Sequence, residues 1–165
     1  VLRLGVEAFV ARAAEAGVDG VLALDLPLEE AEPLRRALSG AGLDTIFLLS
    51  PTTTPERIAL ASRLGSGFLY AISRLGVTGV RAQVAEGAAE LAARIRARAT
   101  LPVAIGFGLS RPEHVREVGA FADAAVVGSV LVDRIAAWAD APDLDARVEA
   151  FTRWLAGNGP APEGP

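Results

Sequence analysis

Apolar positions along this chain alternate between the spacing of helices and the continuous runs of buried strands. Val6, Phe9, Val10 and Ala13 recur at helical spacing, and Gly17 follows as a helix end. Short, wholly apolar runs then alternate with further helical stretches. We expect strands at 21–24, 46–49, 68–72, 103–107 and 124–127, and helices at 6–16, 27–38, from 54 onward, 85–99, 110 onward, 130–138 and 144–155.

The expected strands are apolar on both faces, which is typical of a parallel sheet that is covered on both sides or closed on itself. The alternation therefore predicts an α/β fold of five β/α units with parallel strands. In such folds ligands bind at the carboxyl edge of the sheet. The residues that follow the five expected strands are Asp25, Ser50, Ser73, Gly108 and Gly128.

Two glycine turns follow the last two expected strands, at 106–110 and 127–129. Glycine lets a backbone approach an anion closely, and free amides at a helix start point toward it. A (β/α) barrel builds its phosphate site in this way, from the loops after its last two strands. Gly108 and Gly128 could also be tight turns that bind nothing. Ser110 and Glu113 are spaced as a capping box around Pro112.

Composition narrows the possible chemistry. All sixteen basic residues are arginine, so a Schiff-base lysine is excluded. Cysteine is absent, which excludes disulfides and thiol nucleophiles, and the net charge of −4 argues against a nucleic-acid partner. No apolar run reaches membrane-spanning length, and we expect a cytoplasmic protein.

The length of 165 residues suits one domain but falls short of the roughly 250 residues of a complete eight-fold barrel. The chain begins at Val1 and has no methionine, which suggests a piece of a longer protein. We expect one domain at 1–156 and a disordered, Gly/Pro-rich tail at 157–165.

Several single residues allow two interpretations. Tyr70 and Phe107 each suit either a core or a pocket. Asp25 could be an acid/base, although we favour a loop-capping role. His114, the sole histidine, is expected to face solvent, and the three arginines at 94, 96 and 98 are expected to form a solvated surface.

Five segments carry a resemblance to a known family. The stretch SRLGVTG at 73–79 is the most specific of them, and the others are VLALDLP at 21–27, IFLLSP at 46–51, IGFGLSRP at 105–112 and VVGS at 126–129. In this order they resemble the C-terminal two-thirds of the tryptophan synthase alpha subunit family. The resemblance implies a partial (β/α)8 TIM barrel whose five strands are the family's fourth to eighth.

The resemblance also implies a function and a site. The family is a carbon–carbon lyase that cleaves indole-3-glycerol phosphate in tryptophan biosynthesis and passes indole to a beta subunit in an α2β2 complex, without a cofactor. The implied phosphate ligands are the amides of Gly79, Gly108, Gly128 and Ser129, with the Ser129 hydroxyl. The implied substrate pocket is lined by Leu22, Tyr70, Thr78, Phe107 and Val126.

The resemblance also implies that the family's catalytic acids are missing from this sequence. The family's two catalytic acids, a glutamate on its second strand and an aspartate in the loop that follows, lie in a segment that this sequence does not match. Retro-aldol cleavage needs groups that move protons, so we expect no catalytic residue here and no activity of the isolated chain. The alternatives are a partial barrel that only binds phosphate, and another sugar-phosphate isomerase or epimerase with Asp25 as its acid/base.

Overall fold

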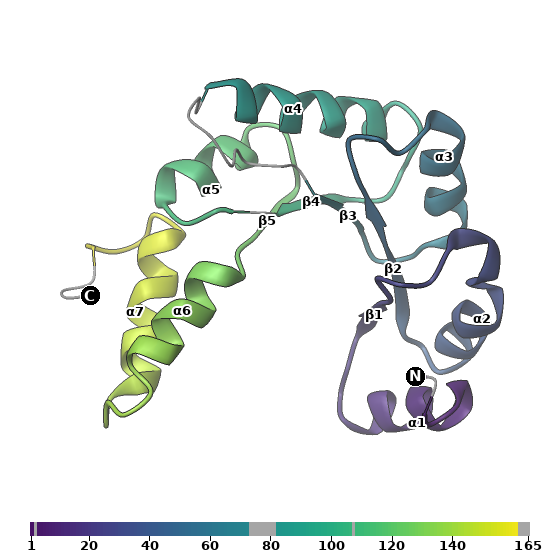
Figure 1. Cartoon of the computed structure of the whole chain (residues 1–165), viewed down its shortest axis with the longest axis horizontal. Helices are drawn as coiled ribbons and strands as arrows, with labels where there is room; N and C mark the ends of the chain where they lie inside the picture. The colour runs from purple at the N-terminus through teal and green to yellow at the C-terminus, as the bar shows by residue number, and fades with distance from the viewer. Residues whose placement is uncertain (2, 73–81, 107, 162–165) are drawn as a thin grey trace.

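The computed structural model describes residues 1, 3–72, 82–106 and 108–161 of the chain, which form an open arc of parallel strands with helices along its convex side (Figure 1). The expected α/β fold of five parallel strands is confirmed. In chain order the elements are α1 (Val6–Glu15), β1 (Gly20–Leu22), a 3₁₀ turn η1 (Leu28–Glu30), α2 (Glu32–Gly40), β2 (Asp44–Leu49), α3 (Pro55–Leu64), β3 (Leu69–Ile72), α4 (Ala82–Arg96), β4 (Val103–Gly106), α5 (Pro112–Gly119), β5 (Ala124–Val126), α6 (Ser129–Ala137) and α7 (Leu144–Leu155).

The five strands lie in the order β1-β2-β3-β4-β5, and every neighbouring pair is parallel. Each connection passes through a helix, as parallel pairing requires. All strands consequently end at one edge of the sheet. The residues that follow them along the chain therefore gather at this carboxyl edge.

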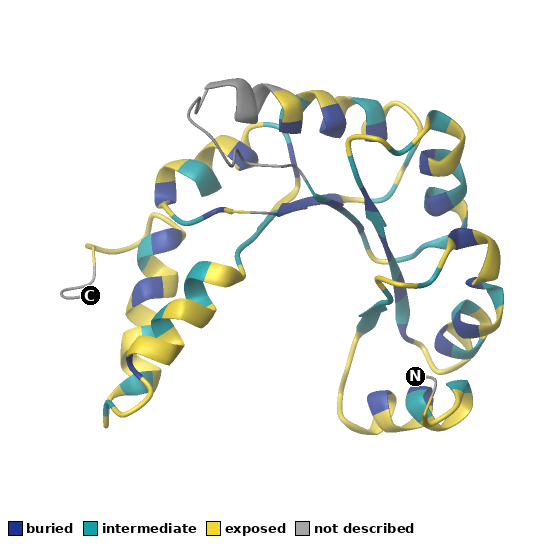
Figure 2. Cartoon of the chain, in the orientation of Figure 1, coloured by how far each residue is buried: buried dark blue, intermediate teal, exposed yellow. Residues whose placement is uncertain are grey.

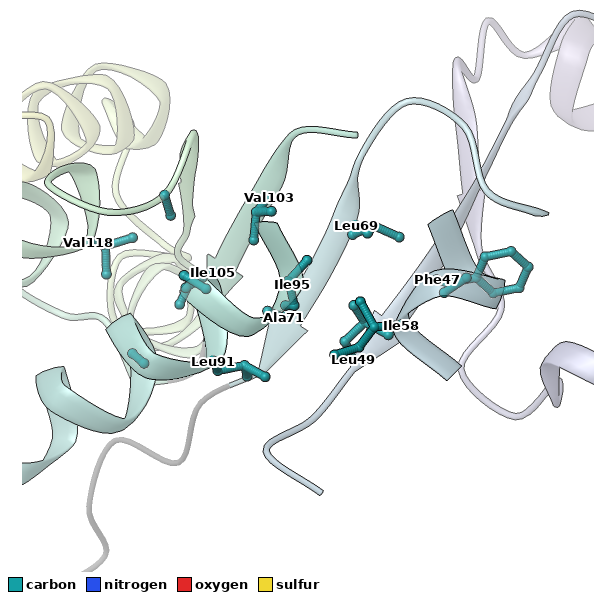
Figure 3. Close-up of a cluster of buried hydrophobic side chains, with 14 of the residues drawn as sticks. Phe47, Leu49, Ile58, Leu69, Ala71, Leu91, Ile95, Val103, Ile105 and Val118 are labelled. Atoms are coloured by element: carbon teal, nitrogen blue, oxygen red, sulfur yellow. The ribbon is translucent and has the colours of Figure 1, made fainter. Parts of the chain in front are cut away.

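The convex face of the sheet holds the main core. In β2 the residues at odd positions are buried and those at even positions are partly exposed, so the two faces of this strand are distinct. Helices α3, α4 and α5 cover the buried face with large apolar side chains, which Figure 3 shows converging on β2, β3 and β4. The fully or nearly fully buried residues of this cluster include Leu49, Ile58, Leu69, Ala71, Leu91, Ile95, Val103 and Ile105.

Helix α3 begins as the sequence predicts. Thr54 is its N-cap, its hydroxyl accepts the backbone N–H of Arg57 at 3.4 Å, and Pro55 occupies the first helical position.

The helix expected at 27–38 is instead divided into η1 and α2. Pro33 explains the division, because a proline inside a helix removes one N–H donor and clashes with the carbonyl four residues earlier. In the structure Pro33 lies in the first turn of α2, where both defects are tolerated. The strand expected at 21–24 ends at Leu22, and the helix expected at 85–99 spans Ala82–Arg96.

The expectation that Arg94 belongs to a solvated surface is wrong. Its guanidinium reaches from α4 to the β2–α3 loop, where Nη1 donates to the Pro51 carbonyl at 2.9 Å and Nη2 donates to the Thr53 carbonyl at 2.6 Å. The same loop is closed internally by the Ser50 N–H, which donates to the Thr53 hydroxyl at 2.8 Å. Arg96 and Arg98 are exposed, as expected, and Arg96 pairs with Asp123 at 3.0 Å.

The two ends of the arc are more exposed to solvent than the strands in its middle (Figure 2). Among the described residues, the large exposed apolar side chains lie in the N-terminal segment up to the residues after β1 and in α6, which follows β5. Leu24 is 65% exposed at one end, and Val132 in α6 is 63% exposed at the other. Within the described ranges no helix is long and apolar enough to cross a membrane.

The packing of α3 on the sheet predicts a large loss of stability for Ile58→Ala. Ile58 is fully buried against the convex face, so its truncation leaves a cavity and should lower the free energy of unfolding by about 2–5 kcal/mol. The matched control is Ile135→Ala on α6, where the side chain is exposed and the loss should stay below about 1 kcal/mol. Urea unfolding of the three proteins measures both values, and equal losses would contradict this assignment of the core.

Candidate functional site

Three of the predicted pocket residues share the concave face of the sheet. Leu22 pairs with Ile46 on β2, Tyr70 pairs with Leu48, and Val126 pairs with Gly106 on β4. Cross-strand partners in a parallel sheet point to the same side, as do residues two apart on one strand. The register therefore places Leu22, Tyr70 and Val126 on one face, opposite the face that the helices cover.

Tyr70 lies across Gly106, close to the carboxyl edge. A Cβ atom at Gly106 would come within 2.8 Å of the Tyr70 Cε2 atom and 3.0 Å of Cζ, so the phenol ring occupies the space that a larger residue would fill. Since Tyr70 pairs with Ala104, the ring extends two residues along β4 toward the glycine turn. Burial raises the pKa of Tyr70 above its ordinary value of 10.0.

The first glycine turn is fixed at three successive residues. Gly108 has a φ of +74°, which side chains rarely allow. Leu109 is only 3% exposed and packs into the main core. The Ser110 N–H donates to Nδ1 of His114 at 3.2 Å, within the first turn of α5.

The capping box predicted from Ser110 and Glu113 is wrong. Helix α5 begins at Pro112, and its N-cap is Arg111, which makes no side-chain capping bond to the described residues. Proline is favoured at the first helical position, which moves the cap one residue past Ser110. His114 is half-buried and bonded to the turn, so the expectation that it faces solvent is wrong as well.

The second turn ends directly at a helix N-terminus. Gly128 is the N-cap of α6, and its carbonyl accepts the N–H groups of Leu131 at 2.9 Å and Val132 at 3.1 Å. Helix geometry leaves the amides of the first residues, Ser129 and Val130, without an acceptor in the helix itself. A Cβ atom at Gly128 would meet nothing within 4 Å, so the space beside this backbone is open.

The pairing of β4 with β5 brings the two turns together. Gly106 pairs with Val126, and both turns begin within two residues of that pair. Gly108, Gly128 and Ser129 are all exposed at this edge. Backbone amides at a helix start, a hydroxyl and the helix dipole suit a phosphate group.

A hollow lies at the other end of the carboxyl edge, beside β1 and β2. It has a volume of about 350 Å³, and its lining includes Asp25, Leu48 and Thr53. Arg57 also lines it and pairs with Glu29 at 2.5 Å, and this hydrogen bond lowers the pKa of the Glu29 carboxyl. β2 and β3 separate Asp25 from the glycine turns, so the structure does not bring Asp25 together with them.

Thr78, Gly79 and Phe107, three of the predicted site residues, lie outside the described residues. The described part of the predicted site consists of Leu22, Tyr70, Gly108, Val126, Gly128 and Ser129. Sequence reasoning missed the contact of His114 with Ser110, because this contact depends on the local turn geometry. Its position four residues after Ser110 was the only signal in the sequence.

Comparison with known proteins identifies the family of this chain. A model of the tryptophan synthase alpha chain matches residues 1–156. The chain belongs to the tryptophan synthase alpha chain family. Its relatives include the alpha chain of Solibacter usitatus, 46% identical over 155 residues, and that of Methanothermobacter thermautotrophicus, 49% identical over 136 residues. Members of this family are lyases, and their fold is the (β/α)8 barrel.

Solved structures agree with the family and with the partial barrel. A tryptophan synthase α2β2 complex from Pyrococcus furiosus superposes with a TM-score of 0.83 at 34% identity and covers 94% of this chain. An open form of tryptophan synthase from M. tuberculosis, with BRD0059 bound, superposes with a TM-score of 0.81 at 35% identity and covers 96% of this chain.

The chain spans 58% of the length of the Solibacter alpha chain and 50% of the Methanothermobacter one. It spans 62% and 57% of the two superposed chains. The five strands are therefore part of the eight-strand barrel of the tryptophan synthase alpha family.

The position of Tyr70 predicts that Gly106→Ala disturbs this site. The added methyl group collides with the phenol ring, so the ring must move, at a cost of about 1–3 kcal/mol in unfolding free energy. Gly119→Ala is the matched control, because a Cβ atom there meets nothing within 4 Å. Chemical denaturation of both variants measures the difference, and a neutral Gly106→Ala would show that the ring does not lie over Gly106.

The raised pKa of Tyr70 predicts a loss of stability at high pH. The unfolded chain releases the phenol proton near pH 10, whereas the folded chain retains it to higher pH, so stability is full below pH 10 and falls as pH rises above it. Tyr70 is the sole tyrosine, so the ultraviolet absorbance of phenolate reports it alone. We expect a higher midpoint in the folded chain than in urea. Coincident midpoints would contradict the burial of this ring.

Proposed function

We propose that this chain carries the substrate-binding half of an indole-3-glycerol phosphate lyase, the activity of the tryptophan synthase alpha subunit. The phosphate is held by the amides of Gly79, Gly108, Gly128 and Ser129 and by the Ser129 hydroxyl. The indole and glycerol portion lies against Leu22, Tyr70, Thr78, Phe107 and Val126. The observation that carries this proposal is the Gly106–Val126 pair, which sets two glycine turns side by side at the carboxyl edge.

The concave face supports the assignment of the indole end. It presents the apolar side chains of Leu22, Leu48 and Val126 on the same face as Tyr70, and an indole buries most favourably against such surfaces. The phosphate turns lie at the β4–β5 end of the same edge. A ligand with one apolar end and one phosphate end matches this division.

Retro-aldol cleavage needs proton transfer at the indole ring and at a glycerol hydroxyl. These 165 residues include no lysine for Schiff-base chemistry. The family's two catalytic acids have no counterpart in this sequence, and Asp25 lies across β2 and β3 from the phosphate turns. We propose that the 165-residue chain alone binds substrate but does not turn it over.

The proposed partner is the beta subunit of tryptophan synthase. The support is the similarity to the Pyrococcus chain, which was solved as part of an α2β2 complex. In this arrangement the alpha site supplies indole and the beta subunit consumes it.

A second candidate function is phosphate binding by a partial barrel that serves no reaction. The observation that favours it is the exposure of apolar side chains such as Leu24 and Val132 at the two ends of the arc (Figure 2). An exposed sheet edge and apolar surface promote association with other chains. An isomerase or epimerase that uses Asp25 has no such support.

Gly128→Asp tests the phosphate site directly. A carboxylate at this N-cap suits the helix, so the fold should persist, but its charge occupies the space assigned to the phosphate. We expect glycerol 3-phosphate to bind about tenfold more weakly than to the unaltered chain, as measured by calorimetry. Gly119→Asp adds the same charge at the C-terminal end of α5 and should bind normally.

The same preparations test the proposed inactivity. Indole release from indole-3-glycerol phosphate by the isolated chain should not exceed background. Turnover well above background would contradict the assignment of the acids to the unmatched segment. Equal affinity of Gly128→Asp and Gly119→Asp for glycerol 3-phosphate would contradict the phosphate site.

A further inference from the structure

His114 is joined to the first phosphate turn by a hydrogen bond that the proposed reaction does not use. The imidazole lies in the first turn of α5, is half-buried, and accepts the Ser110 backbone N–H through Nδ1 at 3.2 Å. An imidazole that accepts through Nδ1 is neutral and has its proton on Nε2. The bond closes a loop of five residues, from Ser110 to His114, around the start of the helix.

The bond completes the support of a turn that must face an anion with its backbone. Gly108 provides the left-handed conformation, and Leu109 anchors the turn in the core. Without this acceptor, the Leu109–Ser110 peptide would lose the hydrogen bond that fixes its orientation on the C-terminal side of Gly108. A turn that is ordered before its ligand arrives loses less entropy on binding.

We propose that His114 is a positioning residue for the phosphate site. It holds the Ser110 N–H toward the imidazole. This orientation leaves the exposed backbone at Gly108 facing the anion that Gly128 and Ser129 bind. The inference rests on the proposed function, since it assigns a role to a neighbour of the same site. His114 touches the turn and is not required to touch the ligand.

Three substitutions of His114 distinguish the role of the acceptor atom Nδ1 from that of the rest of the side chain. His114→Asn puts an amide oxygen on Cγ, where the imidazole carries Nδ1, so it can accept from Ser110. His114→Gln moves its oxygen one bond farther from the backbone, and His114→Ala removes the acceptor. The Gln variant is the matched control for the Asn variant, because the two side chains share the same chemistry.

The experiment measures two quantities on the full chain. Calorimetry gives the affinity for inorganic phosphate, and amide hydrogen exchange gives the protection of the Ser110 N–H without any ligand. We expect the Asn variant to keep both properties within about twofold. We expect the Gln and Ala variants to bind phosphate about fivefold more weakly and to exchange the Ser110 amide faster, as the loss of one hydrogen bond predicts.

Each other outcome overturns a distinct claim. Normal phosphate affinity in the Gln and Ala variants, with faster exchange at Ser110, would show that the bond exists but does not position the site. Unchanged exchange at Ser110 would show that the bond does not form in solution. Failure of the unaltered chain to bind phosphate, with Ser110 still protected, would contradict the proposed function and with it the role of His114.

Discussion

The packing of three helices on the convex face of the sheet determines how the rest of this structure is arranged. Leu49, Ala71 and Ile105 pair in register across β2, β3 and β4, and Ile58, Leu91 and Ile95 cover that face from α3 and α4 (Figure 3). Successive residues of a strand point to opposite sides, so burial of one set assigns the other set to the concave face. For this reason Leu22, Tyr70 and Val126 lie on the concave face, where we propose that substrate binds.

The same packing fixes the carboxyl edge, where the chemistry is proposed. Parallel pairing sends every strand end to one side, and the Gly106–Val126 pair aligns the last two loops. Leu109 ties the first turn to the core, while α6 starts directly at Gly128. The proposed phosphate site is therefore built from backbone that the fold holds in place.

The fold could be predicted largely from the sequence, because wholly apolar runs between helical stretches define five parallel strands. The assignment of residues to the two faces could not, since Ile46 and Leu48 are as apolar as Phe47 and Leu49. The helix expected at 27–38 ignored the break that Pro33 signals, and the capping box expected at Ser110 placed Pro112 one position too far into its helix. The bonds of Arg94 to the β2–α3 loop join residues more than forty positions apart, which no local pattern reveals.

The most direct test of the central claim, that the two turns form one phosphate site, is a nuclear magnetic resonance titration of the chain with glycerol 3-phosphate. The account predicts saturable shifts of the backbone amides of Gly108, Gly128 and Ser129, with residues around Asp25 and Arg94 unaffected. Shifts that follow the exposed arginines, or shifts at one turn without the other, would contradict the claim that β4 and β5 assemble a single anion site.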